Sequence, residues 1–217
     1  MSDIFNEIDE EVRREKLQKL WDRYQNYIVG GAVLLVLLVG GWRLYQWWEL
    51  KKAIEAGAAF NAAMTLGTEG KHADAEAAFA KIAGTGTQGY RELARLQAAA
   101  ELAQRDPKAA VEAFDTIAAD QRMPQPMRDL AGLRAASLLV DSEPYEKIRE
   151  RLEPLAGPDR AYRNTARELL ALSAWRAGDA ASARKWAAAI MSDAEATPGM
   201  RQRVEMLLAL TAADAKS

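Results

Sequence analysis

Hydrophobic and polar residues follow three patterns in this chain, and each pattern occupies its own stretch. Residues 1–27 mix apolar and charged positions, residues 28–48 form one apolar run, and residues 49–217 show helical alternation rich in alanine. The sequence therefore predicts an amphipathic collar over 1–27, a transmembrane helix over 28–48 and a helical repeat domain over 49–217.

The apolar run is long enough to cross a lipid bilayer. It supplies about the 20 residues that a helix needs to cross roughly 30 Å of hydrocarbon. Its aliphatic residues favour insertion by roughly 3 to 6 kcal/mol, which exceeds the cost of Arg43 near one end. A buried helix of a soluble protein and a cleaved signal peptide are the alternatives. The bulky stretch Trp42 to Trp48 stands where a cleavage site needs small residues.

The collar before the run has apolar residues at three- and four-residue steps, as on one face of a helix. Phe5, Ile8 and Val12 follow this spacing, and Asp9 with Arg13 forms an acid-before-base pair four residues apart. We expect an amphipathic helix that either docks a cytoplasmic partner or orients the span.

Lysine and arginine are more frequent before the span than after it. Five lie between residues 13 and 23, whereas Arg43, Lys51 and Lys52 are the three on the other side. The positive-inside rule then predicts a cytoplasmic N-terminus and a domain on the opposite side. In a Gram-negative bacterium this is a single-pass inner-membrane protein with a periplasmic C-terminal domain.

A repeat organises the chain after the span. Its motif places apolar residues at the first, fifth and eighth positions, and the leading positions of its four copies are 35, 38 and 35 residues apart. Such a period is typical of stacked helix hairpins. The copies are Ala75-x-x-x-Phe79-x-x-Ile82, Ala110-x-x-x-Phe114-x-x-Ile117, Ile148-x-x-x-Leu152-x-x-Leu155 and Ala183-x-x-x-Ala187-x-x-Ile190.

Each copy follows another helical pattern, so each unit is predicted to be a hairpin of two helices. The first helices are expected over roughly 53–67, 90–103, 127–140 and 161–176. Pro198 is expected to open a final helix that runs through Ala213 and caps the last hairpin. The predicted fold is all-α, a right-handed helical solenoid of about four hairpins with a C-terminal capping helix.

Composition narrows the function. Residues from Lys51 onward carry 23 basic and 23 acidic side chains, so the domain has no net field that would attract nucleic acid. The chain has no cysteine, which excludes disulfides, thiolate metal sites and a cysteine nucleophile.

Catalytic signals are scarce. His72 is the sole histidine and is interpreted as a solvated turn residue, because no second histidine or cysteine completes a metal site. The run from Gly84 to Gly89 spells Gly-x-Gly-x-x-Gly, but it follows a helix rather than a strand, so we interpret it as a linker. We expect no enzyme activity, cofactor, metal or small-molecule substrate.

Protein binding is the better hypothesis. In a stack of such hairpins the first helices line a concave face, which here is expected to form a largely apolar groove for an extended or helical partner segment. The alternative is that the same residues pack against neighbouring hairpins or the capping helix. The predicted groove residues are Phe60, Met64, Arg95, Leu102, Leu133, Val140, Leu172 and Trp175.

Two turns carry a resemblance to the tetratricopeptide repeat. Gly178-Asp179 followed by Ala183, and Gly70 followed by Ala75 and Phe79, are similar to its glycine turn and Ala-x-x-x-Phe pattern. The third copy lacks both the glycine turn and the alanine. The resemblance implies a protein-interaction fold.

The N-terminal layout also resembles one family. The charged collar, Leu20-Trp21-x-x-Tyr24 and Tyr27-Ile28-Val29-Gly30-Gly31 precede the repeats, as in the YfgM-like ancillary subunits of the bacterial Sec translocon. This resemblance implies a place in protein export or periplasmic folding, near the translocon and a membrane-anchored chaperone related to the parvulins. An adaptor for cell-envelope assembly or division is the alternative function.

Overall fold

The computed structural model describes the backbone of residues 3–214 and the side chains of residues 21, 23–27 and 29–211. Every regular element among these residues is a helix, so the predicted all-α class is confirmed for them. The chain divides into two compact units, Met1–Ile54 and Glu55–Ser217. The sequence pattern had suggested a boundary between residues 48 and 49.

Helix α1 spans Asp3–Thr68 and contains the apolar run. Side chains from Val33 to Val39 are 54–68% exposed, whereas a core helix of a soluble protein would bury them. By length and composition alone, the stretch Arg23–Thr68 includes one helix segment able to cross a membrane. The predicted apolar and charged faces of the collar before residue 21 lie outside the described side chains.

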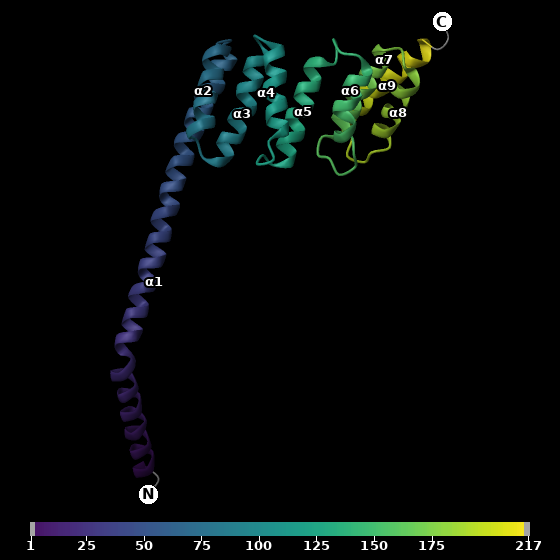
Figure 1. Ribbon diagram of the computed structural model, residues 1–217. Coiled ribbons are helices and arrows are strands. Elements are labelled where there is room, and N and C mark those ends of the chain that lie inside the picture. The colour runs from purple at the N-terminus through teal and green to yellow at the C-terminus, as the bar shows by residue number, and fades with distance from the viewer. Residues whose placement is uncertain (1–2, 215–217) are drawn as a thin grey trace. The chain divides into compact units, whose positions relative to one another are not determined.

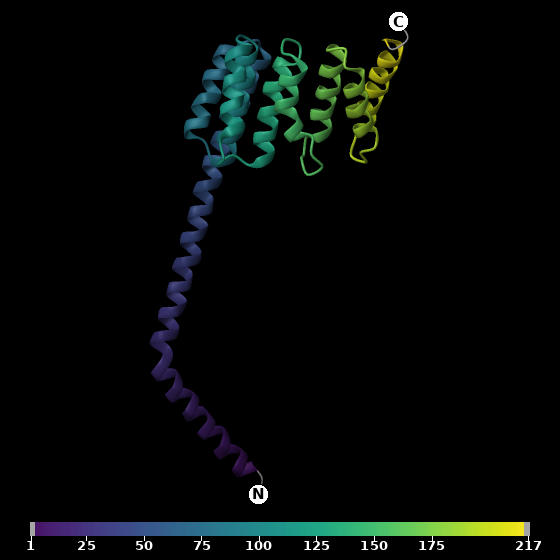
Figure 2. The same ribbon diagram turned by 45° about the vertical axis from the view of Figure 1, so that its right-hand side comes forward.

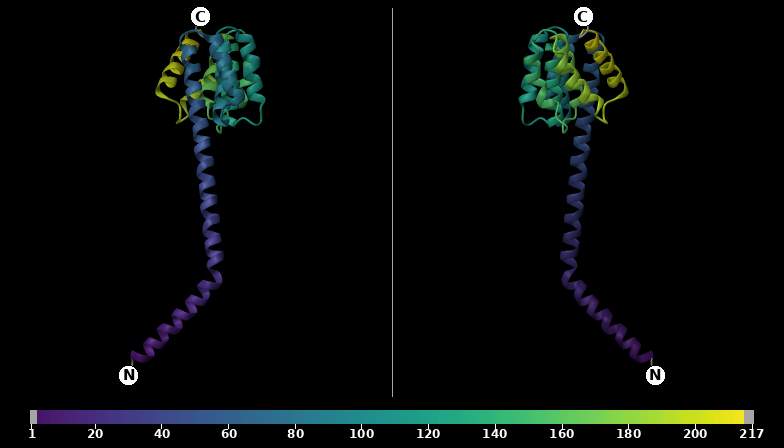
Figure 3. Two further views of the ribbon diagram at one scale, coloured as in Figure 1. Left: turned by 90° about the vertical axis from the view of Figure 1, so that its left-hand side faces the viewer. Right: turned by 90° about the vertical axis from the view of Figure 1, so that its right-hand side faces the viewer.

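The second unit is a succession of antiparallel helices that follow one another in chain order (Figures 1 and 2). Figure 3 views the unit along this succession, so that its helices overlap one another. Each helix packs against the next one along the chain from α2 to α9. The helices are α2 (His72–Thr85), α3 (Gln88–Ala103), α4 (Pro107–Ala119), α5 (Gln125–Leu139), α6 (Tyr145–Leu152), the 3-10 helix η1 (Glu153–Leu155), α7 (Arg163–Arg176), α8 (Ala180–Met191) and α9 (Pro198–Asp214).

The core of this unit is built by the repeat motif. Residues four and seven positions apart lie on one face of a helix, so the motif turns one side of each second helix towards its neighbours. Phe79, Ile148, Leu152 and Ile190 are fully buried, and Phe114 is 2% exposed. The motif alanines are equally buried and let neighbouring helices approach closely.

Local signals set the helix boundaries. Gly70 and Gly178 have φ of +77°, a conformation that glycine adopts at little cost, and each ends the first helix of a hairpin. Asp106 and Asp179 cap the following helices by accepting hydrogen bonds from the backbone N–H groups of Ala109 and Ser182.

The third hairpin departs from the others. Its second helix, α6, has eight residues, and the 3-10 helix and a loop replace further α-helical turns before α7. Pro154 lies in this 3-10 helix, where its missing N–H and ring clash oppose a regular helix interior.

Ion pairs close three of the hairpins. In the second, Arg95 on α3 contacts Asp120 after α4 at 2.7 Å. In the third the charges are reversed, because Asp129 on α5 contacts Arg160 after η1 at 3.3 Å. The fourth has the densest arrangement, since the carboxylate of Asp193 after α8 accepts hydrogen bonds from two arginines of α7. Each pair joins the first helix of a hairpin to the segment that follows the second.

Helix α9 follows the last hairpin, as the sequence predicted. Val204 on its inner face is 1% exposed and packs with Ala187 and Ile190 of α8. Its outer side remains partly apolar, because Met206 and Leu210 are 57% and 49% exposed.

Candidate functional site

Five of the eight predicted groove residues pack inside the second unit. Leu133 and Val140 are each 6% exposed, so both side chains are buried. Phe60 packs edge-on against Phe79, with ring centroids 5.1 Å apart, and Leu102 and Trp175 are partly buried against the neighbouring cores. These five follow the packing alternative that the sequence had left open.

The remaining three reach solvent to different degrees. Met64 on α1 and Leu172 on α7 are 36% and 38% exposed, and they belong to the first and fourth hairpins of the succession (Figure 1). Met64 also accepts a hydrogen bond from Gln97 of α3, with 3.6 Å between sulfur and nitrogen. Met64 and Leu172 therefore belong to hairpins that are not adjacent, and Arg95 lies in a separate polar cleft.

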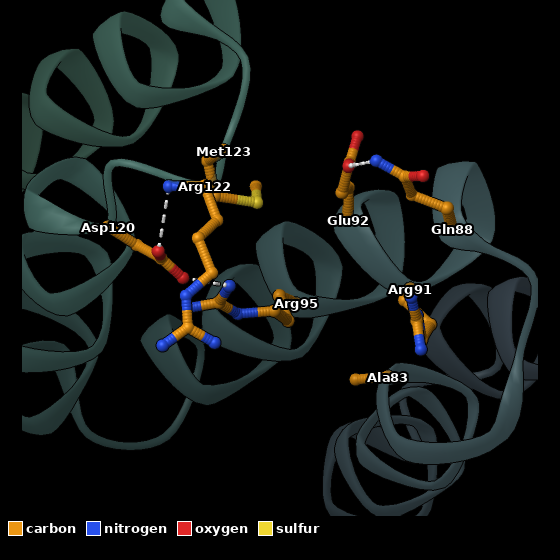
Figure 4. A pocket seen from close by; sticks show the side chains of 8 residues that line it. All are labelled: Ala83, Gln88, Arg91, Glu92, Arg95, Asp120, Arg122 and Met123. Carbon is orange, nitrogen blue, oxygen red and sulfur yellow. Dashed lines mark hydrogen bonds and ion pairs between the residues drawn. The ribbon is translucent and has the colours of Figure 1, made fainter.

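This cleft has a volume of about 440 Å³ and lies beside the first half of α3 (Figure 4). One wall comes from α3 and the end of α2, and the other from the segment that follows α4. Its lining residues are Ala83, Gln88, Arg91, Glu92, Arg95, Asp120, Arg122 and Met123.

A carboxylate anchors the cleft. Asp120 accepts one hydrogen bond from the Arg95 guanidinium at 2.7 Å and another from the backbone N–H of Arg122 at 3.1 Å. These donors, with Arg95 making the larger contribution, hold the pKa of Asp120 below its usual value. The group is therefore a charged acceptor at neutral pH.

Two other guanidinium groups lie in the cleft, and the charge of one of them, Arg122, also helps to lower the pKa of Asp120. Among the described residues, neither Arg91 nor Arg122 has a side-chain hydrogen bond or ion pair, and both are exposed. The charges of Arg95 and Arg122 both act on Asp120, and Figure 4 shows Arg91 apart from these three side chains. Glu92 accepts a hydrogen bond from Gln88 at 3.2 Å.

The functional groups that line the cleft can bind charged and polar partners. They are guanidinium, carboxylate, amide and thioether groups. In the part of the chain that the structure describes, no group of three or more His, Cys, Asp or Glu side chains is placed to hold a metal ion.

His72 differs from its interpretation as a solvated turn residue. It begins α2, and its Nδ1 lies 2.8 Å from Oε2 of Glu101 near the end of α3. The pair is partly buried, so His72 links two helices instead of extending into solvent.

Periodicity alone did not identify the polar cleft. The repeat register predicts Arg95 as a groove residue, but Asp120 and Arg122 follow α4, and helical periodicity makes no statement about a loop. The sequence signal that could have indicated a polar cleft is Arg91. It lies one turn before Arg95, so both side chains project from one side of α3.

Comparison with known proteins identifies a family for this chain. A family model described as a tetratricopeptide repeat-like domain matches residues 18–209. No curated protein and no solved structure matches the chain. The matched segment begins in the collar, includes the apolar run and extends into α9.

Proposed function

Because the chain belongs to the tetratricopeptide repeat-like domain family, we propose that it is a membrane-anchored, non-enzymatic protein-interaction module. The proposed role is to assist protein export or periplasmic folding beside the Sec translocon. The family match across residues 18–209 is the observation that carries the interaction role. Repeat domains of this kind typically bind other proteins through surfaces that stacked helices create.

The apolar run of α1 supports the anchor. Its aliphatic side chains from Val33 to Val39 are exposed, and their burial in a bilayer offsets the unfavourable contact with water. Trp47 and Trp48 end the run, and the ammonium groups of Lys51 and Lys52 lie over their rings at 5.9 and 3.3 Å. Aromatic and basic side chains of this kind suit the membrane interface.

A tether changes what affinity the domain needs. Two proteins held in one membrane meet at a high effective concentration, so weak contacts suffice for a stable encounter. The basic residues before the span favour a cytoplasmic N-terminus and a periplasmic domain. The resemblance of the collar to translocon ancillary subunits supports the translocon and a parvulin-related chaperone as partners.

Crosslinking in intact membranes tests this proposal. A photoreactive amino acid replaces Met64 or Leu172 in the full chain, because both positions are exposed on first helices of hairpins. Arg184, exposed on the second helix α8, provides the control position. We expect translocon or chaperone subunits to be captured from the first two positions and not from the third.

Other outcomes discriminate against the proposal. Capture of cell-wall or outer-membrane assembly proteins would favour the adaptor function instead. Reproducible absence of any protein partner at both test positions, with the protein present at normal level, would contradict an interaction role.

A further inference from the structure

The C-terminal end of the apolar run carries an inference about the lipid that surrounds the anchor. We propose that Trp47, Trp48, Lys51 and Lys52 form a binding site for a phospholipid whose headgroup has a net negative charge, such as phosphatidylglycerol. The inference rests on the proposed function, because it requires the apolar run to lie in a membrane. It deepens that function by naming the lipid that the anchor selects.

The first argument is the placement of four side chains on adjacent helical turns. Lys51 follows Trp47 by four residues, and Lys52 follows Trp48 by four. Each lysine therefore lies one turn after a tryptophan, on the same face of α1. The two tryptophans end the apolar run, and both are more than half exposed. In a membrane, tryptophans at the end of a span lie at the level of the headgroups.

The second argument is the direction in which the lysines extend. The ammonium nitrogen of Lys52 lies 3.3 Å from the centroid of a Trp48 ring, and that of Lys51 lies 5.9 Å from a ring centroid of Trp47. Side chains on a helix lean towards its N-terminus, which here is the direction of the apolar run. Both charges are therefore held beside the tryptophans, in the layer where lipid phosphates lie, instead of extending further into water.

The third argument is that the four side chains offer hydrogen-bond donors and no acceptor. An indole has one N–H and an ammonium group has three, and neither group accepts a hydrogen bond. Among the residues whose side chains the structure describes, none of the four has a side-chain hydrogen bond or an ion pair. The phosphodiester of a lipid has acceptor oxygens and a negative charge. It therefore complements both the donors and the charge of the site.

Two carboxylates lie within about one turn of the lysines and form no ion pair with them. Glu49 precedes Lys52 by three residues and Glu55 follows Lys51 by four, yet no ion pair joins them in the described part of the chain. A lysine that precedes its glutamate is the weaker order of such a pair on a helix. Both lysines also extend towards the tryptophans and away from Glu55. Their ammonium groups thus remain available to a ligand.

Headgroup charge distinguishes between phospholipids at this site. A zwitterionic headgroup such as phosphatidylethanolamine brings its own ammonium group, which meets two like charges and no acceptor on the four side chains. A headgroup with hydroxyl groups in that place avoids this repulsion. Free phosphate shares the anionic chemistry but lacks acyl chains, which would pack against Leu44, an exposed side chain one turn before Trp48. The site is therefore assigned to a lipid and not to a soluble anion.

Photolabelling of the full chain in phosphatidylcholine vesicles tests the inference. The probes are phosphatidylglycerol and phosphatidylethanolamine with the same diazirine-bearing acyl chain, each added in trace amount, and peptide mass spectrometry locates the label. We expect phosphatidylglycerol to label the segment around Trp47 and Trp48 at least about threefold more than phosphatidylethanolamine does. Unlabelled phosphatidylglycerol should compete, whereas inorganic phosphate at the same concentration should not.

Variants connect the lipid preference to these side chains. Lys51→Gln/Lys52→Gln should reduce the preference to about equal labelling by the two lipids. Lys51→Arg/Lys52→Arg should retain it, because arginine keeps the charge and also stacks on aromatic rings. Trp47→Leu/Trp48→Leu keeps the run apolar but should lower the preference about twofold, because the lysines lose the rings that hold them.

Lys81→Gln/Lys108→Gln is the matched control. Both positions are exposed lysines of the second unit, and neither has an ion pair among the described residues. This variant removes the same charge as Lys51→Gln/Lys52→Gln, so a retained preference shows that net charge alone does not set the lipid selectivity. Flotation of every variant with the vesicles shows that the anchor is inserted.

Three results would overturn the inference. They are equal labelling by the two lipids in the parent chain, an unchanged preference in Lys51→Gln/Lys52→Gln, and competition by inorganic phosphate as effective as that by phosphatidylglycerol. A parent chain that floats with the vesicles and shows no lipid preference would remove this inference and leave the proposed function standing. A parent chain that does not float would remove the anchor as well, and with it the proposed function.

Discussion

Replacing Phe79 by alanine should destabilise the first hairpin severely. Phe79 is 0% exposed, lies among Ala63, Ala75, Ile82 and Ala94, and packs edge-on against Phe60. Truncation of a buried phenylalanine costs about 3–5 kcal/mol, and loss of the aromatic pair places this site in the upper part of that range. A single domain is stable by roughly 5–15 kcal/mol, so the substitution removes a large fraction of the total.

The loss should be local at first. Each hairpin of a repeat domain contacts only its neighbours, so the variant should open the end of α1 with α2 and α3 while α7 to α9 remain protected. Hydrogen exchange followed by mass spectrometry on the full chain in detergent locates the opening, and urea denaturation gives its free energy.

The control is Met206→Ala, because Met206 is 57% exposed and its truncation should change stability by less than about 0.5 kcal/mol. If Phe79→Ala unfolds within about 1 kcal/mol of the parent protein and α2 keeps its protection, the packing argument is refuted.

Three further predictions concern charge, backbone and the span. Hydrogen bonds from Arg163 and then from the backbone N–H of Glu195 hold the pKa of Asp193 below the ordinary value, so its stabilisation is present above about pH 4 and is lost as pH falls through the lowered native pKa. Thermal melts of Asp193→Asn should therefore show lower stability at pH 6 and a smaller further loss on acidification than the parent. Gly178→Ala should lower the unfolding free energy by about 1 kcal/mol, because φ is +77°, whereas Gly89→Ala, inside α3 with open space around it, should be neutral or stabilising. Val36→Arg places a charge near the middle of the apolar run at a cost of about 3 kcal/mol, so more of the protein should be extracted from membranes by alkaline carbonate than for the parent.

Each of these has a distinct contradicting result. An acid-denaturation curve of Asp193→Asn that runs parallel to the parent would show that the carboxylate is not stabilising the native state. Equal effects of the two glycine substitutions would show that the turn conformation does not require glycine. Unchanged extraction of Val36→Arg would argue against a span.

The repeat core was predictable because burial on a helix depends on a short-range pattern. Residues at the spacing of Ala75, Phe79 and Ile82 must share a face, and hydrophobic burial then turns that face inward. The start of α9 followed from Pro198, which suits the first turn of a helix.

The binding surfaces were less predictable because the same apolar pattern serves two purposes. Leu133 and Leu172 both lie on first helices of hairpins, yet one is 6% exposed and the other 38% exposed. The difference depends on how neighbouring hairpins stack, which a single helical period does not encode. The pairing of Arg95 with Asp120 likewise depends on the path of a loop. His72 was misplaced for the same reason, since Glu101 comes from another helix.

The direction of the membrane anchor tests the account most directly. One fusion after residue 217 carries a reporter that is active only outside the cytoplasm, and a second carries a reporter that is active only inside it. The account predicts activity from the first fusion and none from the second, with both proteins held in the membrane fraction. A stable fusion with the opposite activities would place the repeat domain in the cytoplasm and contradict a role in export or periplasmic folding.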